Sequence, residues 1–341
     1  MKFPDNLASN DRKFLLYLTY SVFVGSVLII SIIYSLSLLS LIEENPLIIE
    51  SANLSYEKNI YIAVMSGASL KDKINFTYSQ WYEKLRYSNF TSGMGFFIDG
   101  KMKSISGEIP YHFVNDPDDI STHKLISKLF AALKYFLEHS NAGWFLRICE
   151  DTVINLDTFP LFLKELNENF NPYQDFVIQG ACLGKINTTY LQGGSGFVFS
   201  RRAAYQIYQD YSWFRMMTNI NKADDRLLGY YLSKIGVPPA NFTSRWFLGH
   251  SFWKQESALK AVTNVSNIEK CTVPVSRKGC RKFLTKVKDI TFWHDRVPFD
   301  EFVLQHEKIR AATPDNLYFY VPINKPVLCL GDSTTEARYY D

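Results

Sequence analysis

Short apolar runs recur along this chain and predict the strands of a β-sheet. Each run is five to nine residues long and rich in aromatic and β-branched residues, and most of the runs end in glycine or serine. Such runs predict strands at residues 59–67, 95–100, 144–148, 175–180 and 196–200.

A second pattern, with apolar residues three and four positions apart, predicts helices between these strands. Along residues 123–138 it places Leu125, Leu129, Leu133 and Phe136 on one face. Further helices are expected at 157–169 with Pro160 in the first turn, at 201–211 behind Ser200 as N-cap, and from Asp224 and Asp225 to Gly236. Strands that alternate with helices predict an α/β domain with a largely parallel sheet.

The N-terminal segment has a different pattern, because residues 14–42 are apolar and carry no charge. That length exceeds what a helix needs to cross a bilayer, and it is long for a cleaved signal peptide. Lys2, Arg12 and Lys13 precede the run, which predicts a single-pass type II membrane protein. We therefore expect a cytosolic tail at 1–13, an anchor at 14–42, a stem at 43–58, a lumenal domain at 59–310 and an irregular tail at 311–341.

Composition narrows the class of protein further. The formal net charge of +3 argues against a nucleic-acid-binding surface. N-glycosylation sequons begin at Asn53, Asn75, Asn89, Asn187, Asn241 and Asn264, all beyond the predicted anchor. Of the 5 cysteines, Cys271 and Cys280 could close a small loop. An odd number leaves one thiol free or pairing with another chain, which would permit a homodimer.

Candidate chemistry begins at the end of the strand predicted for 144–148. Glu150 and Asp151 follow it directly, and ligands of open α/β sheets bind at such strand ends. These acids fit either a turn or a metal site. Gly193 and Gly194 precede another strand, where glycine lets the backbone approach a ligand. Asp224 and Asp225 open a helix, where capping is the simpler interpretation.

Taken in order, these segments resemble a known family. The helix segment LISKLFAALKY at 125–135 comes first. It is followed by CEDTVINL at 149–156, GGSGFVFSRRA at 193–203, DDRLLG at 224–229 and a histidine in FLGHSF at 247–252. Their order and spacing resemble the Fringe-like β-1,3-glycosyltransferases, which include Fringe and the core 1 galactosyltransferase. The resemblance implies a nucleotide-sugar glycosyltransferase A-type fold, a Rossmann-like mixed sheet flanked by helices, with an N-terminal transmembrane helix.

The same resemblance assigns roles to individual residues. Asp151 falls on the acid expected to bind the metal, and Glu150 on the middle position of that motif. Cys149 stands where the family has aspartate, and a thiol is a poor ligand for a hard cation. Asp225 matches the catalytic base. His250 matches the metal-binding histidine, and His294 is a second candidate for that role.

Donor binding is expected around the first strands. The resemblance places the uridine near Ser66 and Gly67, and near Asp99 at the end of the second strand, although Asp99 also fits a solvated turn. Lys128 matches a family lysine and equally fits a solvated helix position. With Glu150, Gly193 and Gly194 these residues form the expected donor site.

The activity implied is transfer of a sugar from a UDP donor, with Mn²⁺ as cofactor, to a glycan or glycoprotein acceptor at the Golgi or ER membrane. An alternative is a catalytically decayed, membrane-anchored relative that binds glycans or acts as a chaperone, and Cys149 motivates it. A cell-surface adhesion protein is a third hypothesis, which leaves the ordered motifs unexplained.

Overall fold

The structure is a computed structural model, and it describes most of the chain from Ile60 to Pro322. The described residues are 20, 24–27, 60–67, 70–99, 109–114, 124–185, 188–219, 223–237, 244, 246–249, 259–261, 282–286, 290–294, 298–311 and 317–322. The chain divides into two compact units, Met1–Ala52 and Asn53–Asp341. In the first unit, residues 20 and 24–27 are helical. No helix within the described residues has the length and apolarity that a membrane crossing requires.

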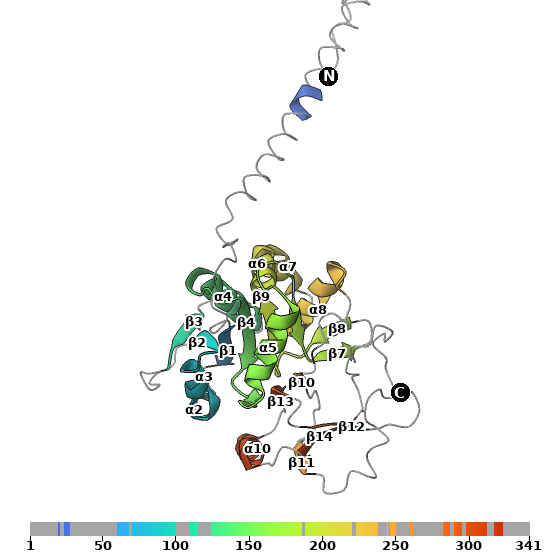
Figure 1. Ribbon diagram of the computed structural model, residues 1–341. Helices are drawn as coiled ribbons and strands as arrows, with labels where there is room; N and C mark the ends of the chain where they lie inside the picture. The colour runs from blue at the N-terminus through green and yellow to red at the C-terminus, as the bar shows by residue number, and fades with distance from the viewer. Residues whose placement is uncertain are drawn as a thin grey trace, which may run out of the picture. The chain divides into compact units, whose positions relative to one another are not determined.

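A six-stranded sheet forms the centre of the second unit (Figure 1). Its order is β3 (Tyr111–Val114), β2 (Thr91–Asp99), β1 (Ile60–Gly67), β4 (Trp144–Cys149), β9 (Phe197–Ser200) and β6 (Ile178–Gly180). The first four strands run parallel, whereas β9 is antiparallel to both β4 and β6. The carboxyl ends of β1 and β4 therefore lie side by side, in the centre of the sheet.

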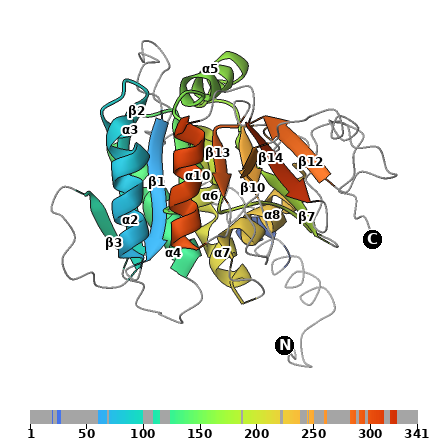
Figure 2. The ribbon, with the colours of Figure 1, turned by 90° about the horizontal axis from the view of Figure 1, so that it is seen from below.

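Helices cover both faces of this sheet, so the unit has three layers (Figures 1 and 2). One face packs on α4 (Lys124–His139), α6 (Arg201–Gln209), α7 (Tyr211–Met217) and α8 (Asp224–Lys234). The other packs on α2 (Lys71–Thr77), which continues through a π-helical turn (Tyr78–Tyr82) into α3 (Glu83–Arg86), and on α5 (Phe159–Asn169).

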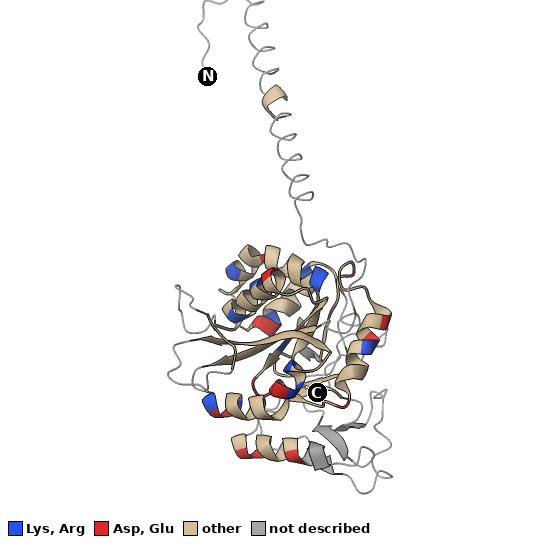
Figure 3. Ribbon diagram, turned by 60° about the vertical axis from the view of Figure 1, so that its left-hand side comes forward, with Lys and Arg blue, Asp and Glu red and all other residues tan. Residues whose placement is uncertain are grey.

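Both faces of β1 are buried, which explains its continuous apolar sequence. Tyr61, Ala63 and Met65 point into one core, and Ile60, Ile62 and Val64 into the other. Figure 3 shows the strands of this sheet largely free of charge, with the Lys, Arg, Asp and Glu residues mainly on the helices. The charged residues buried at the strand ends are therefore exceptions.

Smaller sheets extend the unit beyond the carboxyl end of β4. A three-stranded sheet joins β10 (Phe247–Gly249), β13 (Phe292–His294) and β5 (Val153–Ile154), the strand that follows the acidic residues. The hairpin β7 (Cys182–Lys185) and β8 (Thr188–Leu191) leads into the glycine segment. A third sheet contains β11 (Leu259–Ala261), β14 (Leu317–Pro322) and β12 (Lys282–Lys286), and α10 (Phe299–Ala311) lies next to α2 through Phe76 and Phe302.

Most predicted elements are confirmed, with shifts at their ends. The second strand begins at Thr91 rather than at residue 95, and the strand predicted at 175–180 begins only at Ile178. The helix expected at 201–211 ends at Gln209, and α7 follows it. Ser200 is its N-cap and accepts a hydrogen bond from Ala203 N. Gly236, with φ of +74°, closes α8 as expected.

Candidate active site

Hydrogen bonds hold the backbone of the acidic turn that follows β4. Glu150 N donates to Met65 O of β1 at 3.3 Å, and Cys149 N donates to Thr152 Oγ1 at 2.9 Å. From the helices on one face, the Thr77 hydroxyl donates to Glu150 O, and Trp81 Nε1 donates to Thr152 O at 3.2 Å. The turn is therefore held on a rigid support, as a site that must place side chains accurately requires.

Asp151 lies between two basic groups. Its Oδ1 is 3.3 Å from His294 Nε2, and its Oδ2 accepts from Lys73 Nζ at 3.1 Å. Burial alone would raise the pKa of Asp151, but His294 and Lys73 together hold it below its usual range. Glu150, which is also buried, has its pKa raised by burial and by the neighbouring Asp151. Asp151 is thus the more acidic member of the pair.

Strand pairing brings His294 to this place. β13 pairs antiparallel with β5, which follows the acidic turn, and parallel with β10, where Gly249 is opposite His294. His294 Nδ1 lies 3.2 Å from Gln192 Nε2, so both ring nitrogens have a neighbour. This second contact sets the direction in which the imidazole faces Asp151.

The glycine segment forms a tight turn against the same histidine. A Cβ on Gly194 would lie 2.2 Å from His294 Nδ1, so no other residue fits there without moving the ring. Gly194 O accepts from Thr152 Oγ1 at 2.7 Å, and Ser195 N donates to Gln192 Oε1 at 2.6 Å. Gly196 has φ of +88°. The turn is therefore tied both to the acidic turn and to β13.

Asp225 approaches the glycine turn from the opposite side, at the start of α8. Its Oδ2 accepts from Gly193 N at 3.2 Å, and its Oδ1 accepts from Arg226 N at 2.7 Å. Burial raises the pKa of Asp225 to about 6, with a further contribution from the negative charge of Asp224, and the hydrogen bond from Gly193 opposes the rise. This carboxyl group is poised to exchange a proton near neutral pH.

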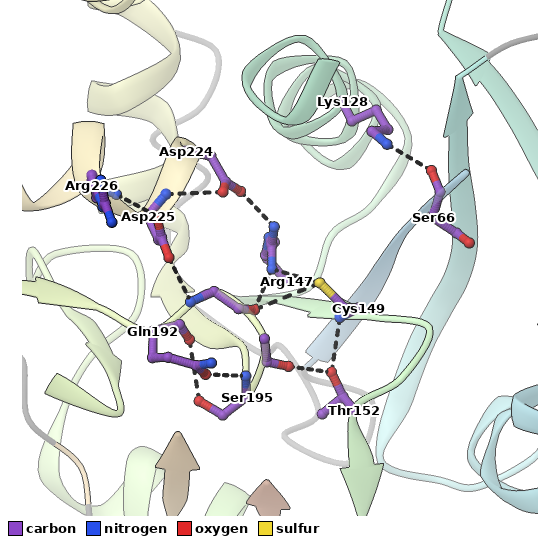
Figure 4. Close-up of polar contacts among 12 residues, drawn as sticks. Ser66, Lys128, Arg147, Cys149, Thr152, Gln192, Ser195, Asp224, Asp225 and Arg226 are labelled. Atoms are coloured by element: carbon purple, nitrogen blue, oxygen red, sulfur yellow. Dashed lines mark hydrogen bonds and ion pairs between the residues drawn. The ribbon is translucent and has the colours of Figure 1, made fainter. Parts of the chain in front are cut away.

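A buried arginine on β4 lies between the acidic turn and α8 (Figure 4). Arg147 Nη2 contacts Asp224 Oδ2 at 2.6 Å, and both side chains are at most 2% exposed. Arg147 Nη1 donates to Gly193 O and contacts Cys149 Sγ at 3.2 Å. Burial raises the pKa of Cys149 to about 12, so this residue is a neutral thiol. Its sulfur contacts Arg147, so Cys149 does not act as a third acid beside Glu150 and Asp151.

The expected donor residues lie at the ends of the neighbouring strands. Lys128 of α4 is buried and donates from Nζ to Ser66 O at 2.7 Å (Figure 4), so the interpretation of Lys128 as a solvated helix residue is wrong. Ser66 is itself 3% exposed. Gly67 ends β1 and pairs with Asp99, the last residue of β2. Ser66, Gly67 and Asp99 thus belong to the carboxyl ends of adjacent parallel strands, and Lys128 contacts one of these ends from α4.

The structure brings most of the predicted residues together. Asp151 and His294 are in contact, and Asp225 shares the glycine turn with them through Gly193 and Gly194. His250 lies outside the described residues. The N-cap of α8 is Ala223 and no side chain caps it, whereas Asp224 and Asp225 lie in the first turn, where a negative charge stabilises the helix dipole.

Sequence reasoning missed two basic residues of the site. Arg147 could have been found, because it is the single charged residue in the apolar run at 144–148. A charged side chain inside a buried strand indicates a buried side chain of opposite charge. Lys73 gave no comparable signal, because it follows two other charged residues near the start of a surface helix.

Three comparisons relate this chain to known proteins. Residues 55–282 match the family model described as Fringe-like, which is more than half of the chain. A mouse (Mus musculus) protein named beta-1,3-glucosyltransferase is 33% identical over 113 residues, which are 33% of this chain and 22% of the mouse protein. The matched domain is of the glycosyltransferase class. More particularly, the chain belongs to the Fringe-like family.

Solved structures resemble this one only distantly. A glycosyltransferase involved in glycosylation of the major capsid of PBCV-1 has a TM-score of 0.40 at 10% identity, over 74% of this chain and all (100%) of that one. The galactosyltransferase LgtC, in complex with donor and acceptor sugar analogs, has a TM-score of 0.36 at 10% identity, over 56% of this chain and 75% of that one.

Proposed function

We propose that this protein is a metal-dependent inverting glycosyltransferase, which moves a sugar from a UDP donor in β-1,3 linkage to a glycan or glycoprotein acceptor. One observation carries the proposal. A single glycine turn contacts Asp225 at Gly193 and His294 at Gly194, and His294 in turn contacts Asp151. The glycine turn thereby links Asp225, the carboxyl group with a raised pKa, to the pair formed by Asp151 and His294.

Asp225 is the proposed base. The acceptor hydroxyl is a weak nucleophile and must lose its proton as it attacks the anomeric carbon. With a pKa of about 6, Asp225 is mostly ionised at pH 7 and is a stronger base than an ordinary carboxylate. The proton moves from the acceptor oxygen to the Asp225 carboxylate, while the bond from the sugar to the diphosphate breaks. A single displacement of this kind inverts the anomeric centre.

Asp151 and His294 would hold the divalent ion. A carboxylate and an imidazole that converge at 3.3 Å fit Mn²⁺ by donor type, and a nucleotide diphosphate would add oxygen ligands. Cys149 does not fit among the metal ligands, because its thiol is neutral and accepts a hydrogen bond from Arg147. When bound, the ion would supply positive charge for the departing diphosphate. Within the described residues, no three His, Cys, Asp or Glu side chains gather as a metal site.

Ser66, Gly67, Asp99 and Lys128 are the proposed residues for the nucleotide and its phosphates, with Glu150 beside them. What supports this is their common position, because ligands of open α/β sheets bind at the carboxyl ends of the strands.

We also propose a type II topology in the Golgi or ER membrane through residues 14–42. Glycosidase sensitivity of the six sequons, together with imaging of a tagged chain, would test that placement.

The proposal is tested with the full-length protein in detergent, incubated with UDP-galactose, UDP-glucose or UDP-N-acetylglucosamine and an acceptor panel, with Mn²⁺ or EDTA. We expect Mn²⁺-dependent release of UDP and a β-1,3-linked product. Folded protein that neither hydrolyses nor transfers any donor would overturn the proposal. UDP binding without turnover would favour the decayed relative, which the Lys73 contact to Asp151 supports, because an ammonium occupies one oxygen of the proposed metal ligand.

A further inference from the structure

Arg147 contacts both Gly193 and Asp224, the two residues that hold Asp225. One end of its guanidinium, Nη2, contacts Asp224 Oδ2 at 2.6 Å, and Asp224 Oδ1 accepts from Asp225 N at 2.9 Å. The other end, Nη1, donates to Gly193 O, and Gly193 N donates to Asp225 Oδ2 at 3.2 Å. These contacts form a closed ring of four residues, which Figure 4 shows.

The ring joins three elements that are distant in the sequence. Arg147 belongs to β4 in the centre of the sheet, Gly193 to the turn before β9, and Asp224 and Asp225 to the start of α8. Without Arg147, the glycine turn stays tied to the acidic turn through Thr152 Oγ1 and Gly194 O, but Asp224 loses its contact with β4. The planar guanidinium suits this task, since it presents several donors in a fixed fork.

We propose that Arg147 is a positioning residue for the catalytic base: it joins Gly193 and Asp224, the two residues that hold Asp225, to strand β4. The inference rests on the proposed function, in which Asp225 takes the acceptor proton. Arg147 acts through Gly193 and Asp224 and needs no contact with a substrate.

Electrostatics supports the same role. Four described charged or titratable groups lie on the elements of the ring, namely Asp224 and Arg226 on α8 and Arg147 and Cys149 on β4. Two more come from neighbouring strands: Tyr190 on β8 packs against the Arg226 guanidinium, and His294 on β13 packs against the glycine turn. Asp224 raises the pKa of Asp225 and Arg147 lowers it. Removal of the arginine would leave two buried carboxyl groups facing each other, so one of them would hold its proton to a higher pH.

Two substitutions should move the titration of Asp225 in opposite directions. Arg147→Gln removes the cation, and we expect it to raise the apparent pKa of Asp225 by about one pH unit or more. Asp224→Asn removes the neighbouring negative charge but retains an acceptor for Asp225 N, and we expect it to lower that pKa. Arg147→Lys keeps the charge but cannot span both partners, so we expect the pKa to stay near that of the wild type while kcat falls.

The matched control is Arg201→Gln. Arg201 is also a buried arginine, 3% exposed, but it donates to carbonyl oxygens of Leu137, Ser140 and Ala142 at the end of α4. Its loss should lower the melting temperature and leave the titration of Asp225 unchanged. A general loss of packing is thereby separated from an effect on the base.

The experiment is ¹³C NMR titration of full-length protein labelled at the aspartate carboxyl carbon, with the Asp225 resonance assigned by its absence in Asp225→Asn. The pH profile of kcat/KM is measured alongside it. An Asp225 pKa that is the same in wild type and Arg147→Gln would overturn the inference. Should Arg147→Gln fail to fold, Arg147→Lys decides, because a wild-type kcat in that variant would show that the two contacts of the guanidinium are not needed. Because the titration needs no turnover, absence of transferase activity would refute the proposed function without deciding this result.

Discussion

Asp151 and Asp225 are linked to one glycine turn, Asp151 through His294 and Asp225 through Gly193, and their electrostatic surroundings differ. Asp151 faces two basic side chains, His294 and Lys73, and its pKa is lowered. Asp225 lies beside a second carboxyl group, Asp224, and its pKa is raised to about 6. The comparison shows how one site can keep one carboxylate for a cation and reserve another for proton transfer, because environment rather than residue type sets each role.

The largest expected effect comes from removing the base. Asp225→Asn keeps the size of the side chain and the hydrogen bond from Gly193 N, but it cannot accept the acceptor proton. We expect kcat to fall about a thousandfold, within the range that general-base catalysis contributes. Initial rates of transfer measure the loss, and calorimetry should show unchanged affinity for UDP with Mn²⁺. A variant that kept wild-type kcat would remove Asp225 from the mechanism.

Asp151→Asn tests the other side of the comparison. An amide is a weaker ligand than a carboxylate and gives His294 no anionic partner. We expect the affinity for Mn²⁺ to fall about a hundredfold or more, with a smaller effect on the fold. Titration of Mn²⁺ into the protein, in the presence of UDP, measures this change. Equal Mn²⁺ affinity in wild type and variant would contradict the proposed role of Asp151.

The pH dependence of activity should report Asp225 rather than Asp151. A carboxyl group with a pKa of about 6 is protonated below pH 6 and then cannot act as a base. We therefore expect kcat/KM to fall as the pH drops through about 6, by roughly tenfold for each further pH unit, and to change little from this group above pH 7. Steady-state rates at saturating Mn²⁺ give the profile. An acid limb centred near pH 4 would indicate an ordinary carboxyl group.

The smallest expected effect concerns Lys73. Its ammonium contacts the same carboxylate that would bind the metal, and the pair is partly exposed, so their attraction is modest. We expect Lys73→Gln to raise the affinity for Mn²⁺, measured without nucleotide, by about threefold. Lys71→Gln is the matched control, because Lys71 lies two residues earlier on α2 and is exposed. Weaker Mn²⁺ binding in Lys73→Gln would show that the lysine supports the metal site.

The arrangement of the site could be predicted from the sequence only in part. The acidic turn, the glycine turn and the start of α8 each follow or precede a strongly patterned element, so their positions at strand and helix ends could be inferred. The contact between Asp151 and His294 could not, because it depends on the pairing of β5 with β13, two short strands far apart in the sequence. Short strands carry little local signal, and their partners are set by packing.

The sequence by itself determined the parallel core strands, the helices around them and the Fringe-like motifs, because apolar spacing, caps and glycine positions are local properties of the chain. The tertiary structure alone decided which imidazole faces Asp151, that Cys149 is a neutral thiol beside Arg147, and that Arg147 joins β4 to the residues around Asp225. These features arise from burial and from contacts between distant segments, and only the folded chain brings such segments together.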